Sequence, residues 1–430
     1  MNPYLQYMYS YPHKTAYGPL KNTTLAHRAQ ELTGANHSLY LHLPFCQTKC
    51  GYCNLFSVTG QKRSDIDRYL NAVERQIGQY AEILASCRTE FSDFTIGGGT
   101  PLLLDENQLE RAFRMIRGRL RFQRELETVV ETAPNQTKRG KLDLLKQFHV
   151  TRISMGVQSF SDRELQALWR RHSAQTARKA ITLLKAYSFP CINLDFIYGI
   201  PGQTVESLLN TLREAITFEP DELFLYPLYI KHGAGLQRHS QDGLVLHPEL
   251  AFLQYREASQ FLHAEGFHQI SMRRFVRKNS YGVSDCGFSS SLALGCGGRS
   301  YLGNLHFCSP YAITRTSCLK QIRQYETTED FTSIDYGILL SKDEEKRRYI
   351  IRHLFIYPGL RLESYQKNFG SSALQDFQLL KKWMQEGYCH LANDFLTMTE
   401  EGLGLSDYLG PQLISPNIRK RMNEWEALYG

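Results

Sequence analysis

The chain has 430 residues, of which 42% are apolar, and is long enough for one large enzyme core with additions or for two domains. Its 50 basic and 43 acidic residues leave a net charge of only +7, an excess too small to indicate a nucleic-acid-binding surface. The sequence has neither an apolar N-terminal run typical of a signal peptide nor an apolar window of about 18 residues, so we expect a cytoplasmic protein with reduced cysteines and no membrane contact.

Strand-like and helix-like segments alternate from about residue 38 to residue 230. The strand segments are too apolar to leave one face in water, which is typical of a parallel sheet covered by helices. Six strands are predicted, at residues 38–43, 91–96, 126–133, 151–158, 190–202 and 221–230. Helices are predicted at residues 64–84, with Ser64 as the N-cap, and at 105–120, 141–148, 161–170, 174–187 and 203–218. Six such units predict either an open doubly wound sheet or a curved partial barrel.

The pattern changes after about residue 245. A helix is predicted at 248–266, a glycine-rich stretch follows at 293–304, and the chain becomes helix-rich from about residue 340. We therefore predict four parts, which are an N-terminal extension at 1–37, a barrel at 38–245, a barrel-associated segment with the glycine-rich stretch at 246–339, and a small, winged-helix-like module at 340–430.

Three cysteines, Cys46, Cys50 and Cys53, stand within eight residues directly after the first predicted strand. A structural zinc site normally needs four protein ligands and a disulfide needs two. The spacing C-x₃-C-x₂-C suits a [4Fe–4S] cluster, in which three thiolates leave one iron open. S-adenosylmethionine (SAM) could chelate this iron through its amine and carboxylate and then be cleaved reductively to a 5′-deoxyadenosyl radical that abstracts hydrogen. Zinc bound with His42 or with a distant fourth ligand is the alternative.

The string YLHLPFCQTKCGYC, at residues 40–53, resembles the radical SAM superfamily, and more narrowly the branch around oxygen-independent coproporphyrinogen III oxidase (dehydrogenase). That branch also includes heme chaperones, heme-degrading methyltransferases and class C radical methylases. The resemblance covers roughly residues 38–310 and implies a partial (β/α)₆ barrel, consistent with the six units above. It also implies a [4Fe–4S] cluster, one or two SAM molecules, a reducing partner such as flavodoxin or ferredoxin, and an organic substrate, with a tetrapyrrole of porphyrin biosynthesis as one candidate.

Further motifs follow the other predicted strands. The segment GGGTP, at 97–101, lacks side chains at its start, so its backbone could approach a ligand closely. Glu131, Gln158 and Asp195 stand at or near strand ends, and a buried Asp195 should have a polar partner. The resemblance places nine residues in contact with SAM, namely Tyr40, Tyr52, Gly98, Gly99, Thr100, Glu131, Gln158, Arg170 and Asp195. Arg171 competes with Arg170 for its assignment, because Trp169 replaces the smaller residue that is commoner in the family.

The sequence departs from two patterns of this branch. The oxidases have a further cysteine two residues after the third cysteine, where this chain has Leu55. The heme chaperones have a His-Asn-x-x-Tyr-Trp stretch, of which only Asn279 and Tyr281 are present here. Three activities therefore stay open, which are hydrogen abstraction by an oxidase-like radical SAM oxidoreductase, radical methyl transfer of the class C type, and heme binding or carriage with little turnover.

Several residues outside these motifs could also carry function. Cys286, Cys296, Cys308 and Cys318 could hold an auxiliary cluster or be unrelated thiols. The aromatic segment at 7–17 could lie over the barrel mouth and present His13 and Lys14 to substrate carboxylates, or it could be a surface strap. An acidic substrate could also bind three arginines of the second half, with solvated surface as the alternative. These are Arg273, Arg274 and Arg277.

Overall fold

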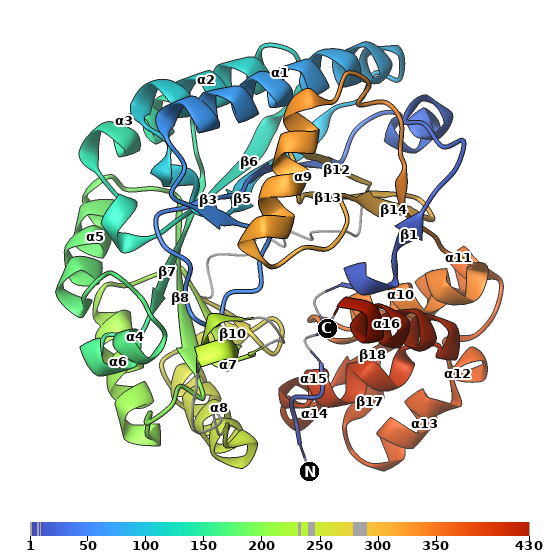
Figure 1. The fold of residues 1–430 in the computed structure, drawn as a ribbon. Coiled ribbons are helices and arrows are strands. Elements are labelled where there is room, and N and C mark those ends of the chain that lie inside the picture. The colour runs from blue at the N-terminus through green and yellow to red at the C-terminus, as the bar shows by residue number, and fades with distance from the viewer. Residues whose placement is uncertain are drawn as a thin grey trace.

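The computed structural model describes residues 2–6, 8, 10–230, 234–239, 246–277 and 290–429. Six parallel strands form its centre and lie side by side in chain order (Figure 1). They are β2 (His37–Leu43), β5 (Phe91–Gly98), β6 (Phe122–Thr132), β7 (Arg152–Gln158), β8 (Cys191–Tyr198) and β9 (Glu222–Pro227). All six predicted strands are thus confirmed. In β2 and β8 nearly every side chain is buried, which explains why these segments are continuously apolar.

Helices connect the six strands and cover the outer side of the sheet (Figure 1). They are α1 (Arg63–Ser86), α2 (Glu106–Arg117), α3 (Arg139–Gln147), α4 (Asp162–Ala167), α5 (Ala174–Ala186) and α6 (Val205–Thr217). The predicted N-cap at Ser64 was wrong. The helix begins at Arg63, because the Asp65 carboxylate accepts a hydrogen bond of 2.8 Å from the Lys62 N–H and fixes the turn two residues earlier.

Further strands extend both edges of this sheet. On the β2 side they are β12 (Ser291–Leu294), β13 (Arg299–Leu302), β14 (Leu305–Cys308), β15 (Tyr336–Leu339) and β1 (Gly18–Pro19), and on the β9 side β11 (Arg274–Arg277) and β10 (Phe267–Gln269). Within the described residues the strand order runs from β1 to β10 with two open edges. The sheet is therefore curved but not closed, as predicted for a partial (β/α)₆ barrel. The glycine-rich stretch forms the turn between β12 and β13 and the β13–β14 hairpin.

The C-terminal part has its own small sheet and its own hydrophobic core around Tyr365 and Trp383. Its strands are β16 (Leu360–Arg361), β17 (Cys389–Ala392) and β18 (Phe395–Met398). Its helices are α10 (Lys342–Leu354), α11 (Leu362–Phe369), α12 (Ala373–Asp376), α13 (Gln378–Gln385), α14 (Glu400–Gly404), α15 (Ser406–Leu409) and α16 (Pro416–Tyr429). Tyr11 and Tyr17 of the N-terminal segment belong to the same core, so the two ends of the chain pack together. The predicted boundaries between the four parts stay a prediction.

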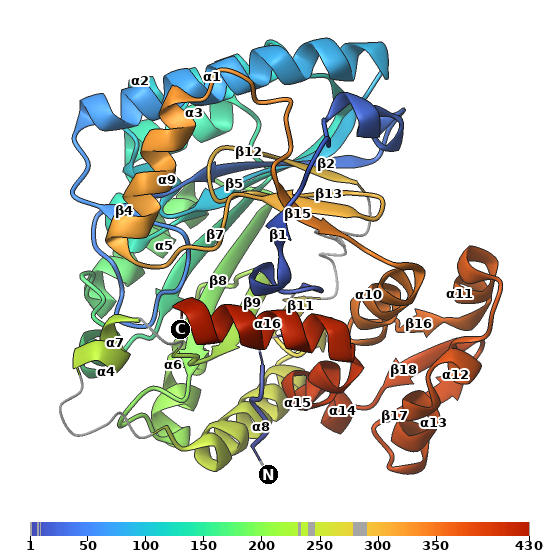
Figure 2. The same ribbon diagram turned by 45° about the vertical axis from the view of Figure 1, so that its right-hand side comes forward.

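Three further α-helices of the described residues follow β9 in the chain, which are α7 (Gly235–His239), α8 (Pro248–Ala264) and α9 (Arg315–Thr327). Of these, α8 packs against α6 and α9 packs against α1. Figure 2 shows the C-terminal part beside the inner side of the curved sheet, with α16 pointing back toward the barrel. A search of the described residues found no helix with the length and apolar character that crossing a membrane requires.

Candidate functional site

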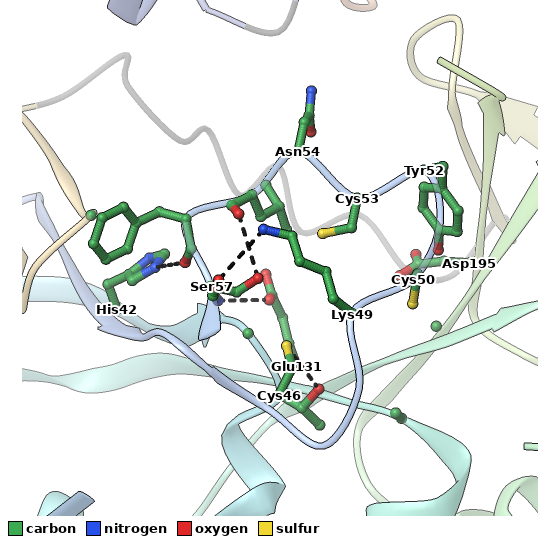
Figure 3. Close-up of a pocket in the computed structure, with 18 of the residues that line it drawn as sticks. His42, Cys46, Lys49, Cys50, Tyr52, Cys53, Asn54, Ser57, Glu131 and Asp195 are labelled. Atoms are coloured by element: carbon green, nitrogen blue, oxygen red, sulfur yellow. Dashed lines mark hydrogen bonds between the residues drawn. The ribbon is translucent and has the colours of Figure 1, made fainter. Parts of the chain in front are cut away.

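A cavity of about 620 Å³ lies at the carboxyl ends of the parallel strands (Figure 3). The three cysteines of the motif and the nine other predicted residues all contribute to its wall. They come from segments far apart in the sequence, because the carboxyl ends of parallel strands meet at one edge of the sheet. The structure therefore brings the twelve predicted residues together, and their individual roles stay predictions.

The cysteine loop is fixed at both of its ends. It leaves β2 through β3 (Phe45–Cys46), which pairs with β4 (Val58–Thr59), so residues 46–59 form a closed loop along the cavity. Figure 3 shows Cys46, Cys50 and Cys53 spaced along this loop. Burial raises the pKa of the Cys46 thiol to about 12, and the neighbouring Cys53 adds to the shift. Thiols in such surroundings ionise when a positive group lies beside them, as an iron–sulfur cluster would.

The geometry of the donor groups distinguishes a cluster from a single metal ion. Among the described residues, no three His, Cys, Asp or Glu side chains come close enough to hold one ion. His42, the alternative fourth ligand for zinc, donates from Nε2 to the Phe56 carbonyl at 2.9 Å. The three thiols line one cavity but do not converge on one point. This arrangement fits a [4Fe–4S] cluster, because each thiolate then binds a different iron.

The GGGTP segment packs directly against the cysteine loop. Gly99 donates its N–H to Leu43 O and Thr100 donates its N–H to Phe45 O, both at 2.8 Å. A Cβ at Gly99 would lie 2.4 Å from the Phe45 oxygen, and Gly98 has a φ of +113° with the His42 ring 2.7 Å from its would-be Cβ. Only glycine fits these two positions, so the end of β5 exposes bare backbone to the cavity.

Two half-buried carboxylates line the cavity from β6 and β8, the strands on either side of β7 (Figure 3). Glu131 accepts a hydrogen bond of 3.1 Å from the Gly98 N–H, and burial raises its pKa. Burial also raises the pKa of Asp195 to about 7. Asp195 has the polar partners that its burial requires, since Asn193 donates to it at 2.7 Å and Ser154 at 3.4 Å. Sequence reasoning did not identify Asn193 or Ser154, which carry no motif of their own.

Arg170 connects the cysteine loop to β7. Its guanidinium donates to the Cys50 sulfur at 3.2 Å and to the Gly156 carbonyl at 2.6 Å. Arg171 also lines the cavity, but its side chain is exposed. Arg170 is therefore the arginine that contacts the motif, and its predicted contact with SAM stays a prediction.

Three further predicted residues complete this part of the wall. Gln158 has a φ of +72°, which turns the chain sharply where β7 ends. The ring of Tyr52 packs with the apolar residues around Leu168 and Ile197. The Tyr40 hydroxyl lies 3.5 Å from His42 Nδ1. Each of these side chains extends the cavity wall from a different strand or loop.

Lys49 was missed by sequence reasoning. It stands inside the cysteine motif and lines the cavity. Its ammonium donates to the Ile313 carbonyl at 2.6 Å and to the Ser57 carbonyl at 3.5 Å (Figure 3). It thereby joins the cysteine loop to the segment after β14, a long-range contact that the local sequence does not indicate.

The arginines predicted for an acidic substrate have different surroundings. Arg273 and Arg274 are each only 8% exposed, so solvated surface is the wrong interpretation for both. Arg274 forms an ion pair with Glu222, and the Arg277 guanidinium lies 5.1 Å from the Phe267 ring centre. Arg273 alone among the three lines the cavity, and it forms an ion pair with Asp407 of α15.

The auxiliary cluster considered for Cys286, Cys296, Cys308 and Cys318 stays untested. Burial raises the pKa of Cys296, and Cys318 and Cys308 lie close enough to add to this shift. Cys286 lies outside the described residues, as do Asn279 and Tyr281 of the stretch compared with the heme chaperones.

The comparisons with known proteins agree with this geometry. Residues 40–215 match the family model of the radical SAM superfamily. Oxygen-independent coproporphyrinogen III oxidase of Escherichia coli (strain K12) is 26% identical over 387 residues, which cover 85% of this chain and 82% of that protein. Heme chaperone HemW of Bacillus subtilis (strain 168) is 25% identical over 374 residues, which cover 85% of this chain and 96% of that protein.

A solved structure shares the overall architecture. Coproporphyrinogen III oxidase (HemN) from Escherichia coli, described as a radical SAM enzyme, has a TM-score of 0.83 with this chain at 24% sequence identity. The match covers 95% of this chain and 96% of that chain, so the fold is common to both. Residues 40–215 therefore belong to the radical SAM superfamily, which implies a [4Fe–4S] cluster and SAM as cofactors, and the chain as a whole is similar to oxygen-independent coproporphyrinogen III oxidases and HemW heme chaperones.

Proposed function

We propose that this protein is an oxidoreductase that uses radical SAM chemistry to abstract hydrogen from a tetrapyrrole, in a manner that resembles coproporphyrinogen III oxidase. The proposal rests mainly on the composition of one cavity. One part of its wall consists of the three thiols and the backbone of Gly98 and Gly99. Another part consists of aromatic and cationic side chains from residues outside 40–215, the range that matches the radical SAM family model. Its volume of about 620 Å³ falls in the range of cavities that hold organic ligands.

Different residues of the cavity wall would bind the cluster and the different parts of SAM. When bound, the cluster and SAM supply a radical that removes hydrogen from an unactivated carbon. Cys46, Cys50 and Cys53 would hold the cluster, and the backbone at 98–100 would accommodate the amine and carboxylate of SAM. Glu131 would accept hydrogen bonds from the ribose hydroxyls. Flavodoxin or ferredoxin would be suitable external electron donors.

Leu55 helps to distinguish between the possible reactions. Leu55 lines the cavity and is 53% exposed, so an apolar group faces the cavity where the oxidases have a further cysteine. This observation supports hydrogen abstraction in general more than the complete oxidase reaction. The similarity to HemW supports a second candidate function, which is heme binding with little turnover. Radical methyl transfer with two SAM molecules is the third outcome that an experiment must separate.

Product analysis distinguishes the three functions. Protein reconstituted without oxygen is incubated with dithionite and SAM, either alone, with coproporphyrinogen III or with heme, and the mixtures are read by mass spectrometry. We expect 5′-deoxyadenosine to form faster with a tetrapyrrole present, together with a mass change in that tetrapyrrole. S-Adenosylhomocysteine as a second product would indicate methyl transfer. Tight heme binding with neither product would indicate a carrier.

The role of Glu131 is tested by an isosteric change. Glu131→Gln removes the charge that strengthens hydrogen bonds to hydroxyl groups, so we expect about tenfold weaker SAM binding with unchanged iron content. Equilibrium dialysis with labelled SAM and an iron assay measure the two quantities. Glu127→Gln is the matched control, because Glu127 lies on the same strand but not in the cavity wall. Equal SAM affinity in all three proteins would remove Glu131 from the binding site.

A further inference from the structure

The N-terminal segment at residues 10–17, here called the strap, forms a fixed part of the cavity wall. Ser10 accepts a hydrogen bond from Arg299, and the Tyr11 hydroxyl donates to the buried Glu344. Figure 2 shows the strap between the curved sheet and the C-terminal part, close to α16. With Tyr11 and Tyr17 buried in the C-terminal core, the strap holds its half-buried side chains, His13 and Lys14, in defined positions.

Lys14 is the strap residue that carries charge into the cavity. Its ammonium donates to the Gly297 carbonyl at 2.8 Å, and among the described residues it forms no ion pair with a carboxylate. Gly297 is itself fixed, since it has a φ of +96° and a Cβ there would lie 2.6 Å from the Phe56 ring. The turn that holds Lys14 is therefore packed tightly against the cysteine loop.

The charges along the cavity wall are unequal. Among the residues that the structure describes, six cationic side chains line the cavity against two carboxylates, and the six are Lys14, Lys49, Arg170, Arg171, Arg273 and Arg299. Both carboxylates, Glu131 and Asp195, belong to the strands assigned to SAM. The described part of the wall that lies outside residues 40–215 has Lys14, Arg273 and Arg299 among tyrosines and no Asp or Glu. Within that wall Arg273 pairs with Asp407, whereas the bonding partner of Lys14 is a neutral carbonyl.

We propose that Lys14 determines substrate specificity by binding a carboxylate of a flat, multiply acidic substrate. An ammonium in a partly buried cavity gains most from an anionic partner, and tyrosines beside it suit the flat body of such a molecule. Tyr229, Tyr301 and Tyr311 line the same wall. This inference rests on the proposed function for the nature of the site, and it adds the residue and the chemical group that select the substrate.

The test compares an acidic porphyrin with its uncharged ester. Coproporphyrin III and its tetramethyl ester are titrated into reconstituted protein, and binding is followed by porphyrin fluorescence. For Lys14→Met we expect affinity for the acid to fall about tenfold or more, while affinity for the ester stays the same. Lys14→Arg keeps the charge and should stay close to the unsubstituted protein. Lys21→Met is the matched control, because Lys21 is exposed and lies outside the cavity.

The possible results separate this inference from the proposed function. Equal affinity of Lys14→Met and the unsubstituted protein for the acid would overturn the role of Lys14, even if the acid binds tightly. Equal affinity of the unsubstituted protein for acid and ester would overturn it as well. Lack of binding of the acid to unsubstituted protein, with no 5′-deoxyadenosine formed with any tetrapyrrole, would overturn the proposed function too. Iron content and circular dichroism of each variant verify that the fold and the cysteine site are intact.

Discussion

Replacing Cys50 with alanine should leave a protein that neither retains a cluster nor cleaves SAM. Unsubstituted protein reconstituted without oxygen should contain about four irons per chain and absorb as a brown cluster. In Cys50→Ala only two thiols remain on the loop, and the buried Arg170 loses the sulfur that it contacts at 3.2 Å. Iron and sulfide assays, the visible spectrum and chromatography of 5′-deoxyadenosine measure the loss.

Cys191→Ala provides the matched control for this experiment. Burial raises the pKa of Cys191 to about 12, as it does for Cys46, but Cys191 lies on β8 outside the cavity wall. Its replacement should cost roughly 1 kcal/mol of packing and leave the iron content unchanged. A Cys50→Ala protein that still held four irons, or a Cys191→Ala protein that lost them, would contradict the assignment of the cluster to the cysteine loop.

The central strands could be predicted because their signals are local, whereas the nine predicted SAM contacts came from the resemblance to a known family and keep the standing of predictions. A parallel strand that is buried on both faces is a continuous apolar run, and a site at the strand ends follows each run directly. These features depend on residues close together in the sequence.

The rest of the site depends on contacts between distant segments. The strands β12 to β15 have four residues each, too few to show a clear alternation. The anchoring of Lys14 by Gly297 joins residues 283 positions apart. The pairing of Arg273 with Asp407 joins residues 134 positions apart, and nothing near Arg273 in the sequence indicates a buried partner.

Asp407 lies outside the cavity, and its loss should strongly destabilise the fold. Its side chain is fully buried, and it forms an ion pair with Arg273. It also accepts hydrogen bonds from the Tyr229 hydroxyl at 2.6 Å and from the Met8 N–H at 3.0 Å. One carboxylate thus joins α15, the cavity wall and the N-terminal segment. Removing one partner of a buried ion pair costs about 3–5 kcal/mol, because the other charge stays buried without compensation.

We therefore expect Asp407→Ala to lower the free energy of unfolding by about 3–5 kcal/mol, measured by urea titration of the protein. Glu424→Ala removes a carboxylate from an exposed pair with Lys420 on α16 and should change stability by less than about 1 kcal/mol. The double variant Asp407→Leu with Arg273→Met leaves no unpaired charge and should regain most of the loss. If Asp407→Ala were as stable as Glu424→Ala, the buried pair would not hold the cavity wall to the C-terminal part. Because Arg273 and Tyr229 both line the cavity, loss of their shared partner should also weaken porphyrin binding in protein that remains folded.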